Sequence, residues 1–307
     1  MSFALSTSWN ASRYEDAQGL VAEIKSLGFK EIELSFNLTR PIIEGIDNLR
    51  RQGQIEAVSA HNFCPIPDGL SWQEALPDYY SMSSLDERVR QEAVKYSKIS
   101  IDTASGIGAK VVVLHCGRVE MPDYTRQLID LYLKRDKDSA QYRTIKSDFI
   151  RQRKELIGPF FENTLRSLKE LVPYAASREI MLGIENRFYY REIPSLEETG
   201  VILDAFRGKN VFYWHDTGHA QIMGYLGFGG QKEFLELYAK DMIGMHIHDV
   251  YRGQDHHAPS KGELDFASLK PYLTRETLKV IEAHSQATDS DLKESKRYLE
   301  ALWDGKV

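Results

Sequence analysis

The sequence has few cysteines and no long apolar run. Cys64 and Cys116 are the two cysteines in 307 residues, too few for a disulfide framework, and we expect both to be free thiols in a reducing compartment. No stretch of about 18 consecutive apolar residues occurs, so a membrane-spanning helix is not expected. The first ten residues, MSFALSTSWN, lack the basic region and long apolar run of a signal peptide. These absences predict a cytoplasmic protein.

An excess of positive charge is also missing. The formal net charge is −6, which gives no broad attraction to the phosphate backbone of DNA or RNA. Nucleic acid is therefore not the expected partner. The charged runs RDKDS and RQRKE are interpreted as solvated helix faces and not as a site for a polyanion.

A glycine-rich phosphate turn, Gly-x-Gly-x-x-Gly, does not follow the first apolar run, which argues against an open doubly wound sheet. Short β-branched runs instead alternate with long amphipathic segments. Eight strands are predicted, at 3–8, 31–35, 56–61, 110–115, 180–185, 211–216, 242–249 and 278–284. Helices are predicted near 15–27, 40–52, 88–105, 160–177, 197–206, 231–239 and 266–273, with a last one from about 289. Eight βα units predict an α/β fold, a closed (β/α)₈ TIM barrel.

No low-complexity linker divides the chain, so residues 1–307 are predicted to form a single domain. Two long insertions interrupt the regular alternation, residues 62–86 after the third strand and residues 117–158 after the fourth. Loops of this length in a compact domain usually cover a site or form a contact surface. The second insertion is charged and helix-prone. It could be a lid over the barrel or the arm of a homo-oligomer, and the sequence does not choose between them.

Histidines and carboxylates gather where the predicted strands end. The active site of a TIM barrel lies at the carboxyl ends of its strands, where side chains from different strands converge. A lone histidine or glutamate there more often packs or caps a helix, but six of the eight predicted strands end in a residue type that binds Zn²⁺, Mn²⁺ or similar ions. These residues are His61, His115, Glu185, Asp216, His246 and Glu282.

The turns after the sixth and seventh strands add further candidates. In the motif HDTGH, His219 follows Asp216 by three residues, so both side chains can point into one pocket. His215 should point the opposite way along its strand, because side chains alternate with period two. The same alternation places His246 and His248 on one face of the seventh strand. Either of them could be a ligand.

Together these motifs resemble the xylose isomerase-like TIM-barrel superfamily, which holds sugar isomerases and epimerases, inosose dehydratase and the apurinic-site nuclease endonuclease IV. The likeness covers nearly the whole chain, from EIELS to IEAH. The matching motifs are SAH at His61, VVLHCG at His115, GIEN at Glu185, DTGH at Asp216 and His219, HIHD at His246, DHH followed by LDF at Asp255 and His257, and VIEAH at Glu282.

The resemblance to the sugar enzymes implies one divalent ion, Zn²⁺, Mn²⁺, Mg²⁺ or Co²⁺. The implied ligands are Glu185, Asp216, His246 and Glu282. It further implies that Glu185 and Glu282 remove and return the proton next to a carbonyl group while the ion stabilises the enediolate. Substrate contacts are expected from His61, His115, His219 and Arg252. The preferred hypothesis is a sugar isomerase or epimerase that acts on a small polyhydroxy carbonyl compound.

The resemblance to endonuclease IV implies a different centre, with up to three zinc ions that activate water against a phosphodiester. The additional ligands would be His61, His115, His219, Asp255 and His257. Three departures weaken this alternative: NFCPIP follows His61 where the nuclease has a tyrosine-containing loop, Cys116 follows His115 in place of proline, and the loop after Glu185 and Asn186 reads RFYYREIP. An inosose-type dehydratase shares the first proton abstraction and stays open as a second alternative. A third is a non-catalytic barrel that binds a sugar-like ligand through a structural ion.

Overall fold

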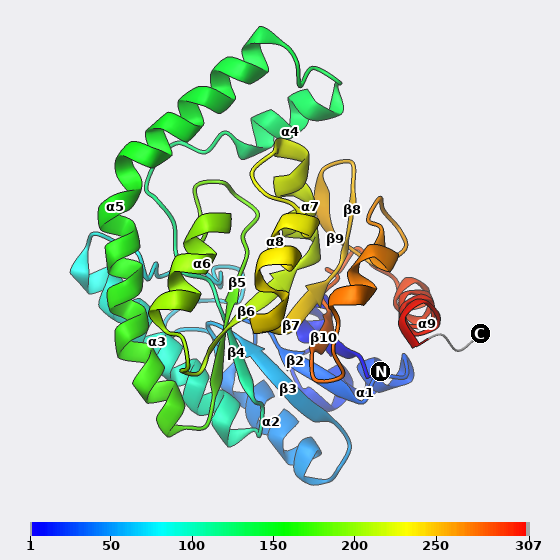
Figure 1. The fold of residues 1–307 in the computed structure, drawn as a ribbon. Helices are drawn as coiled ribbons and strands as arrows, with labels where there is room; N and C mark the ends of the chain where they lie inside the picture. The colour runs from blue at the N-terminus through cyan, green and yellow to red at the C-terminus, as the bar shows by residue number, and fades with distance from the viewer. Residues whose placement is uncertain (1, 305–307) are drawn as a thin grey trace.

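The computed structural model describes residues 2–304, and its centre is a closed barrel of eight parallel strands (Figure 1). The barrel order is β1-β10-β7-β6-β5-β4-β3-β2. The strands are β1 (Ala4–Ser6), β2 (Glu31–Leu34), β3 (Glu56–His61), β4 (Val111–Leu114), β5 (Met181–Glu185), β6 (Val211–Asp216), β7 (Met242–Ile247) and β10 (Leu278–Ile281). A separate antiparallel hairpin of β8 (Asp249–Tyr251) and β9 (Gln254–His257) follows β7. The predicted (β/α)₈ barrel is confirmed, and the hairpin is an addition to it.

Helices surround the barrel (Figure 1). They are α1 (Ala17–Ser26), α2 (Arg40–Arg51), α3 (Glu87–Gly106), α4 (Thr125–Leu133), α5 (Ala140–Ser177), α6 (Leu196–Ala205), α7 (Thr217–Leu226), α8 (Gln231–Tyr238) and α9 (Asp289–Asp304). Among residues 2–304, no helix combines the length and the apolar character needed to cross a membrane. The helix predicted at 266–273 is a 3₁₀ segment, Phe266–Tyr272. Pro271 inside it disfavours an α-helix, because its ring would clash with the carbonyl group four residues earlier.

Helix α7 was not predicted. Gly218 and Gly224 lower the helix propensity of this segment, but the structure starts a helix directly after β6. The side chain of Asp216 caps that helix by accepting a hydrogen bond from the backbone N–H of His219 at 2.7 Å.

Helix α5 begins twenty residues earlier than the predicted start at 160, at Ala140. Pro159 lies inside it, and a proline ordinarily ends a helix because its ring clashes with the preceding residue. Here the preceding residue is Gly158, which has no Cβ atom to clash. Phe149 and Phe160 on either side of this point are buried in the core, so packing favours one continuous helix.

Side chains inside the barrel form two layers, an apolar layer and, nearer the carboxyl ends of the strands, a polar layer. The apolar layer is a buried cluster of Ala4, Val111, Val113, Trp214 and Val280. Trp214 has room because Gly244 faces it: a Cβ atom at Gly244 would lie 2.2 Å from Cζ3 of the indole. Two residues further along the strands, the next side chain returns to the same face. Asp216 therefore stands above Trp214, and Glu282 stands above Val280.

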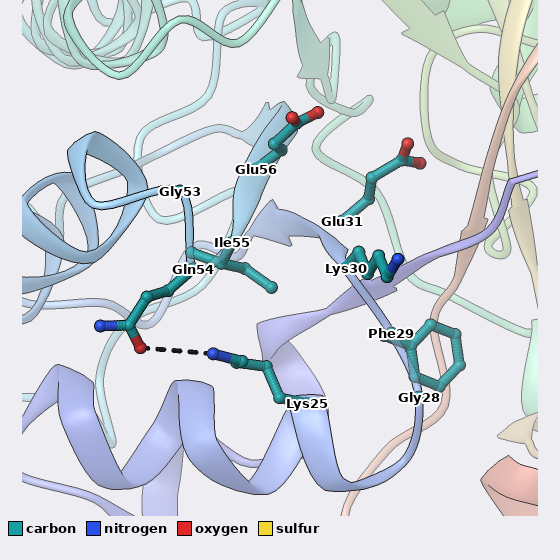
Figure 2. A pocket seen from close by; sticks show the side chains of 9 residues that line it. All are labelled: Lys25, Gly28, Phe29, Lys30, Glu31, Gly53, Gln54, Ile55 and Glu56. Carbon is teal, nitrogen blue, oxygen red and sulfur yellow. Dashed lines mark hydrogen bonds between the residues drawn. The ribbon is translucent and has the colours of Figure 1, made fainter.

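The opposite, amino-terminal end of the barrel also has a hollow, of about 540 Å³ (Figure 2). Among its lining side chains, Lys25 donates a hydrogen bond to Gln54 at 3.3 Å. The groups of converging metal-ligand atoms found among residues 2–304 include none of its lining residues. TIM barrels carry their chemistry at the other end, so this hollow is not a candidate for the functional site.

Candidate metal centre

Four side chains from four strands meet at the carboxyl end of the barrel, and we name them the four-residue centre. Glu185 ends β5, Asp216 ends β6, His246 lies in β7 and Glu282 directly follows β10. One ligand atom from each lies within 4.8 Å of the others, and all four side chains are buried. From Nδ1 of His246, the nearest carboxylate oxygens lie at 2.6 Å (Glu185), 3.2 Å (Glu282) and 3.8 Å (Asp216).

Glu33 on β2 lies behind the ring of His246. Its two carboxylate oxygens are 3.0 and 3.1 Å from Nε2 of His246, and Ser59 donates a hydrogen bond to one of them at 2.7 Å. A carboxylate can only accept, so it holds a proton on Nε2, and Nδ1 is the nitrogen that would bind a metal ion in exchange for its own proton. Glu33 was not among the sequence candidates. The sequence feature that could have identified it is a charged residue between Ile32 and Leu34, in a strand that is buried on both faces.

The electrostatics of the four-residue centre fit a divalent cation. Burial alone would lower the pKa of His246, but Glu282 and Glu33 outweigh burial and raise this pKa well above its ordinary value. The centre therefore stabilises positive charge. One imidazole nitrogen and three carboxylates form a donor set that suits Zn²⁺, Mn²⁺ or a similar ion. An ion there would offset the mutual repulsion of the buried carboxylates.

His61 and His115 form a wall beside Glu185. Nδ1 of His61 is 2.9 Å from the carbonyl oxygen of Asn62, and its Nε2 is 4.0 Å from Oε2 of Glu185. Nε2 of His115 is 2.8 Å from the same oxygen of Glu185, and its Nδ1 is 3.3 Å from Oδ1 of Asp78. Asp78 comes from the insertion after β3. No local pattern in the sequence marks it, because only the fold of that insertion brings it to His115.

Arg187 lies against the same wall. Its Nη1 donates a hydrogen bond to Oε2 of Glu185 and contacts Nε2 of His115. Its Nε is 3.5 Å from Oε2 of Glu192, and its Nη2 is 4.0 Å from Oδ2 of Asp78. The Arg187 side chain is only 7% exposed. Arg187 was not among the site residues predicted from the sequence. It follows Glu185 by two residues, and in an extended chain two such side chains point to the same side.

A second group of possible ligands consists of His219, His248 and His256, whose ring nitrogens lie within 4.8 Å of one another. Asp255 adjoins it, with Oδ2 at 3.8 Å from Nε2 of His219 and 3.3 Å from Nδ1 of His256. Nδ1 of His219 is 3.0 Å from the carbonyl oxygen of Asn186. The carbonyl accepts the Nδ1 proton, so the Nε2 lone pair of His219 remains free.

The side chains of His256 and His257 do not follow the alternation of side chains expected along a strand. His256 has a positive φ of 57°, so the alternation of side chains breaks at this residue. His256 joins the second group, while the ring of His257 lies 6.0 Å from the ring of Tyr251. Among the described residues, His257 belongs to none of the groups of converging ligand atoms. His215 also points away, with hydrogen-bond distances of 2.6 Å to both Tyr213 and Gln231.

A small cavity of about 180 Å³ opens over these groups. It is smaller than the ~300–1,000 Å³ of pockets for drug-sized ligands, so it suits a small molecule. Its lining residues are Phe36, His61, Pro77, His115, Arg126, Glu185, Arg187, Phe188, Tyr189, His219, Asp255, His256, Glu282 and His284. The cavity thus brings together most of the sequence-predicted site residues and combines polar groups with aromatic walls.

Arg126 reaches this cavity from α4, inside the insertion after β4. Its guanidinium carbon is 4.2 Å from the centre of the Phe188 ring, and Nη1 donates to the carbonyl oxygen of Gly253 at 3.2 Å. Arg252, the arginine expected to bind substrate, is exposed and does not line the cavity; its guanidinium lies over the ring of Tyr251. The insertion that supplies Arg126 rises beyond the carboxyl ends of the strands (Figure 1), and α4 contacts α7.

Comparison with known families agrees with this arrangement. The family profile described as xylose isomerase-like TIM barrel matches residues 21–302, which is most of the chain. The chain belongs to this family. The xylose isomerase-like fold therefore rests on both the sequence match and the observed closed barrel.

Individual relatives of this xylose isomerase-like protein are distant. The uncharacterized protein MJ1311 of Methanocaldococcus jannaschii is 24% identical over 193 residues, covering 61% of this chain and 54% of that protein, so the chain spans about half the length of this relative. A D-tagatose 3-epimerase-like protein has a TM-score of 0.66 at 20% identity, with 99% of this chain and 97% of that one covered. The 3-keto-D-glucoside 4-epimerase YcjR of E. coli has a TM-score of 0.70 at 17% identity, with coverage of 98% and 99%. These likenesses establish the fold and leave the reaction to be argued from the site.

Proposed function

We propose that this chain is a divalent-metal-dependent sugar isomerase or epimerase. The observation that supports it most is the four-residue centre, in which two glutamates, Glu185 and Glu282, face one ion site below a small cavity. Isomerisation and epimerisation of a hydroxy-carbonyl compound need a base to remove a proton beside the carbonyl and an acid to return it. Two carboxylates beside one substrate supply both roles.

The four-residue centre would hold the ion through Glu185, Asp216, His246 and Glu282. When bound, the ion supplies Lewis-acid stabilisation of negative charge on substrate oxygen. Burial would raise the pKa of Glu282, but the charges of His246 and His256 outweigh it and hold this pKa well below its ordinary value. Glu282 is therefore ionised at neutral pH and can accept a proton.

Glu185 is held more tightly than Glu282. Its two oxygens contact His246 at 2.6 Å and His115 at 2.8 Å, and Arg187 donates to it as well. Burial would raise its pKa, but Arg187 and then His115 lower it well below its ordinary value. We propose Glu185 as the partner that receives or returns the proton on the other side of the substrate.

In addition to Glu185 and Glu282, we propose His219 as an uncharged contact for the substrate. Burial lowers its pKa to about 4, so the ring is uncharged at neutral pH. Since Nδ1 donates to the carbonyl of Asn186, the free Nε2 can accept a hydrogen bond from a sugar hydroxyl. Phe188, whose ring lies 5.9 Å from that of His219, offers an apolar wall for sugar C–H groups.

Proton exchange with solvent tests this proposal even when the product of the reaction is not identified. Protein loaded with Mn²⁺, Co²⁺, Mg²⁺ or Zn²⁺ is incubated in D₂O with D-tagatose, D-allulose, D-fructose, L-ribulose, D-xylose, a 3-keto-D-glucoside and an inosose. We expect at least one sugar to lose the NMR signal of the proton beside its carbonyl. Exchange should stop when a chelator removes the ion.

The same spectra separate the remaining alternatives. Epimerisation and isomerisation give a new sugar signal, whereas dehydration gives a product that has lost water. If fully metallated protein exchanges no proton in any of these compounds, the proposed function is wrong.

A further inference from the structure

Beside the four-residue centre, the wall of His61, His115 and Glu185 forms a further group of atoms that could hold an ion. Ligand atoms of His61, His115 and Glu185 lie within 4.8 Å of one another, and all three side chains are buried. Glu185 belongs to both groups, so two ions bound at once would share its carboxylate. By the composition of its ligands alone, this wall is as plausible a metal site as the four-residue centre.

The guanidinium of Arg187 already lies between His115 and Glu185 of this wall. Nη1 contacts both Nε2 of His115 and Oε2 of Glu185, the two atoms that an ion there would have to bind. A guanidinium is always charged and donates only. It therefore occupies these lone pairs and also repels a second cation at the same place.

Arg187 is held in this position from its other side. Nε is 3.5 Å from Glu192 and Nη2 is 4.0 Å from Asp78, and Glu192 is itself fixed by the backbone N–H of Tyr189 at 3.0 Å. Both Arg187 and Glu192 are buried. If Arg187 withdrew to admit an ion, the buried carboxylate of Glu192 would lose its cationic partner and keep only the N–H of Tyr189, which is unfavourable.

We infer that Arg187 is a built-in cation that takes the place of a metal ion at His61, His115 and Glu185. The chain then binds an ion at the four-residue centre but none at this wall, so its centre is not the three-metal type that a zinc phosphodiesterase needs. The inference rests on the metal site of the proposed function but not on its reaction.

Metal content per chain tests this directly. Wild-type protein and an Arg187→Met variant are stripped with chelator, loaded with excess Zn²⁺, desalted and analysed by elemental mass spectrometry. We expect the variant to hold one more zinc ion per chain than the wild type, because the wall is then free to bind. Adding His115→Ala to Arg187→Met should remove that extra ion.

An Arg153→Met variant is the matched control. Arg153 is also a buried arginine bound to a carboxylate, with hydrogen bonds of 2.7 and 2.8 Å to Glu198 and one of 2.9 Å to the backbone carbonyl of Glu192, and it contacts none of the candidate ligands. Its zinc content should equal that of the wild type. A gain in Arg153→Met as large as in Arg187→Met would mean that loosening of the fold admits zinc, which would overturn the inference.

Measurements that keep Arg187 in place cover the case in which Arg187→Met does not fold. His115→Ala in the wild-type background should leave the zinc content unchanged, because His115 holds no ion there. A loss of one ion in His115→Ala, three ions per wild-type chain, or equal contents in wild type and Arg187→Met would each overturn the inference. If the wild type binds no zinc, the proposed metal centre is wrong. The inference about Arg187 is still tested in that case, by the gain of zinc in Arg187→Met over the wild type.

Discussion

Glu33 and His246 stand 213 residues apart in the sequence, yet Oε1 of Glu33 lies 3.0 Å from Nε2 of His246. The pair joins β2 to β7 across the interior of the barrel. This contact fixes the Nε2 side of the imidazole, which faces away from the four-residue centre. Nδ1 is thereby directed at the carboxylates of Glu185, Asp216 and Glu282. Carboxylate–histidine pairs of this kind orient metal ligands and raise their basicity.

Glu33→Gln should weaken metal binding by about 10–100-fold, the usual cost of losing such an outer partner. The amide keeps the size of the side chain but removes the negative charge behind His246. Competition with a fluorescent chelator measures the affinity. Glu31→Gln, on the same strand but lining the hollow at the opposite end of the barrel, is the control and should bind metal like the wild type. Equal affinities for both variants would show that Glu33 does not support the ligand.

Glu282→Gln should lower proton exchange on the identified sugar by about 10²–10⁴-fold, the usual contribution of a general base. Metal content measured on the same sample separates loss of the base from loss of the ion. The control is Glu263→Gln, because Glu263 is exposed and accepts a hydrogen bond from Tyr225 at 2.8 Å. Substantial exchange by metal-loaded Glu282→Gln would contradict the role proposed for this carboxylate.

Arg126 lines the cavity, and we propose that it donates a hydrogen bond to the substrate there. Arg126→Ala should therefore raise KM for the identified sugar by about tenfold, the equivalent of one lost hydrogen bond from a charged group. Arg252→Ala tests the competing assignment from sequence. Since Arg252 is exposed and outside the cavity lining, its removal should change KM by no more than about twofold, as for most surface substitutions. Steady-state kinetics of both variants decide the matter: a larger effect at Arg252 would restore the sequence-based assignment.

Gly244→Ala should destabilise the barrel by about 1–3 kcal/mol, the usual cost of overpacking a core. The new Cβ atom would lie 2.2 Å from Cζ3 of Trp214, a rigid ring inside the barrel. Gly106→Ala is the control: it lies in α3 with no heavy atom within 4 Å of the added Cβ, and it should be neutral or stabilising by up to ~1 kcal/mol. Urea unfolding gives both values. Wild-type stability of Gly244→Ala would mean that Trp214 can move aside.

Neither cysteine should react with a thiol reagent in the folded protein. Both side chains are fully buried, and burial raises the pKa of Cys116 to about 12, so at pH 8 almost none of this thiol is in its reactive thiolate form. An assay with Ellman's reagent should detect no thiol before unfolding and two per chain in urea. Rapid labelling of the native protein would show that the loops near the site open.

The sequence determined the barrel and the positions of its candidate metal ligands. Alternation of strands with helices fixed the (β/α)₈ order, and period two within each strand placed Glu185, Asp216, His246 and Glu282 on the inner face. These are local patterns, and a parallel barrel converts them into a shared site because all of its strands end on one side.

The tertiary structure decided which other groups surround that site. Asp78 and Arg126 arrive on long insertions whose course no local pattern specifies, and the positive φ of His256 brings that residue, and not His257, to the second group of ligands. Contacts such as Glu33 with His246 and Arg187 with His115 join distant segments. They depend on strand register and loop packing, which arise only when the whole chain has folded.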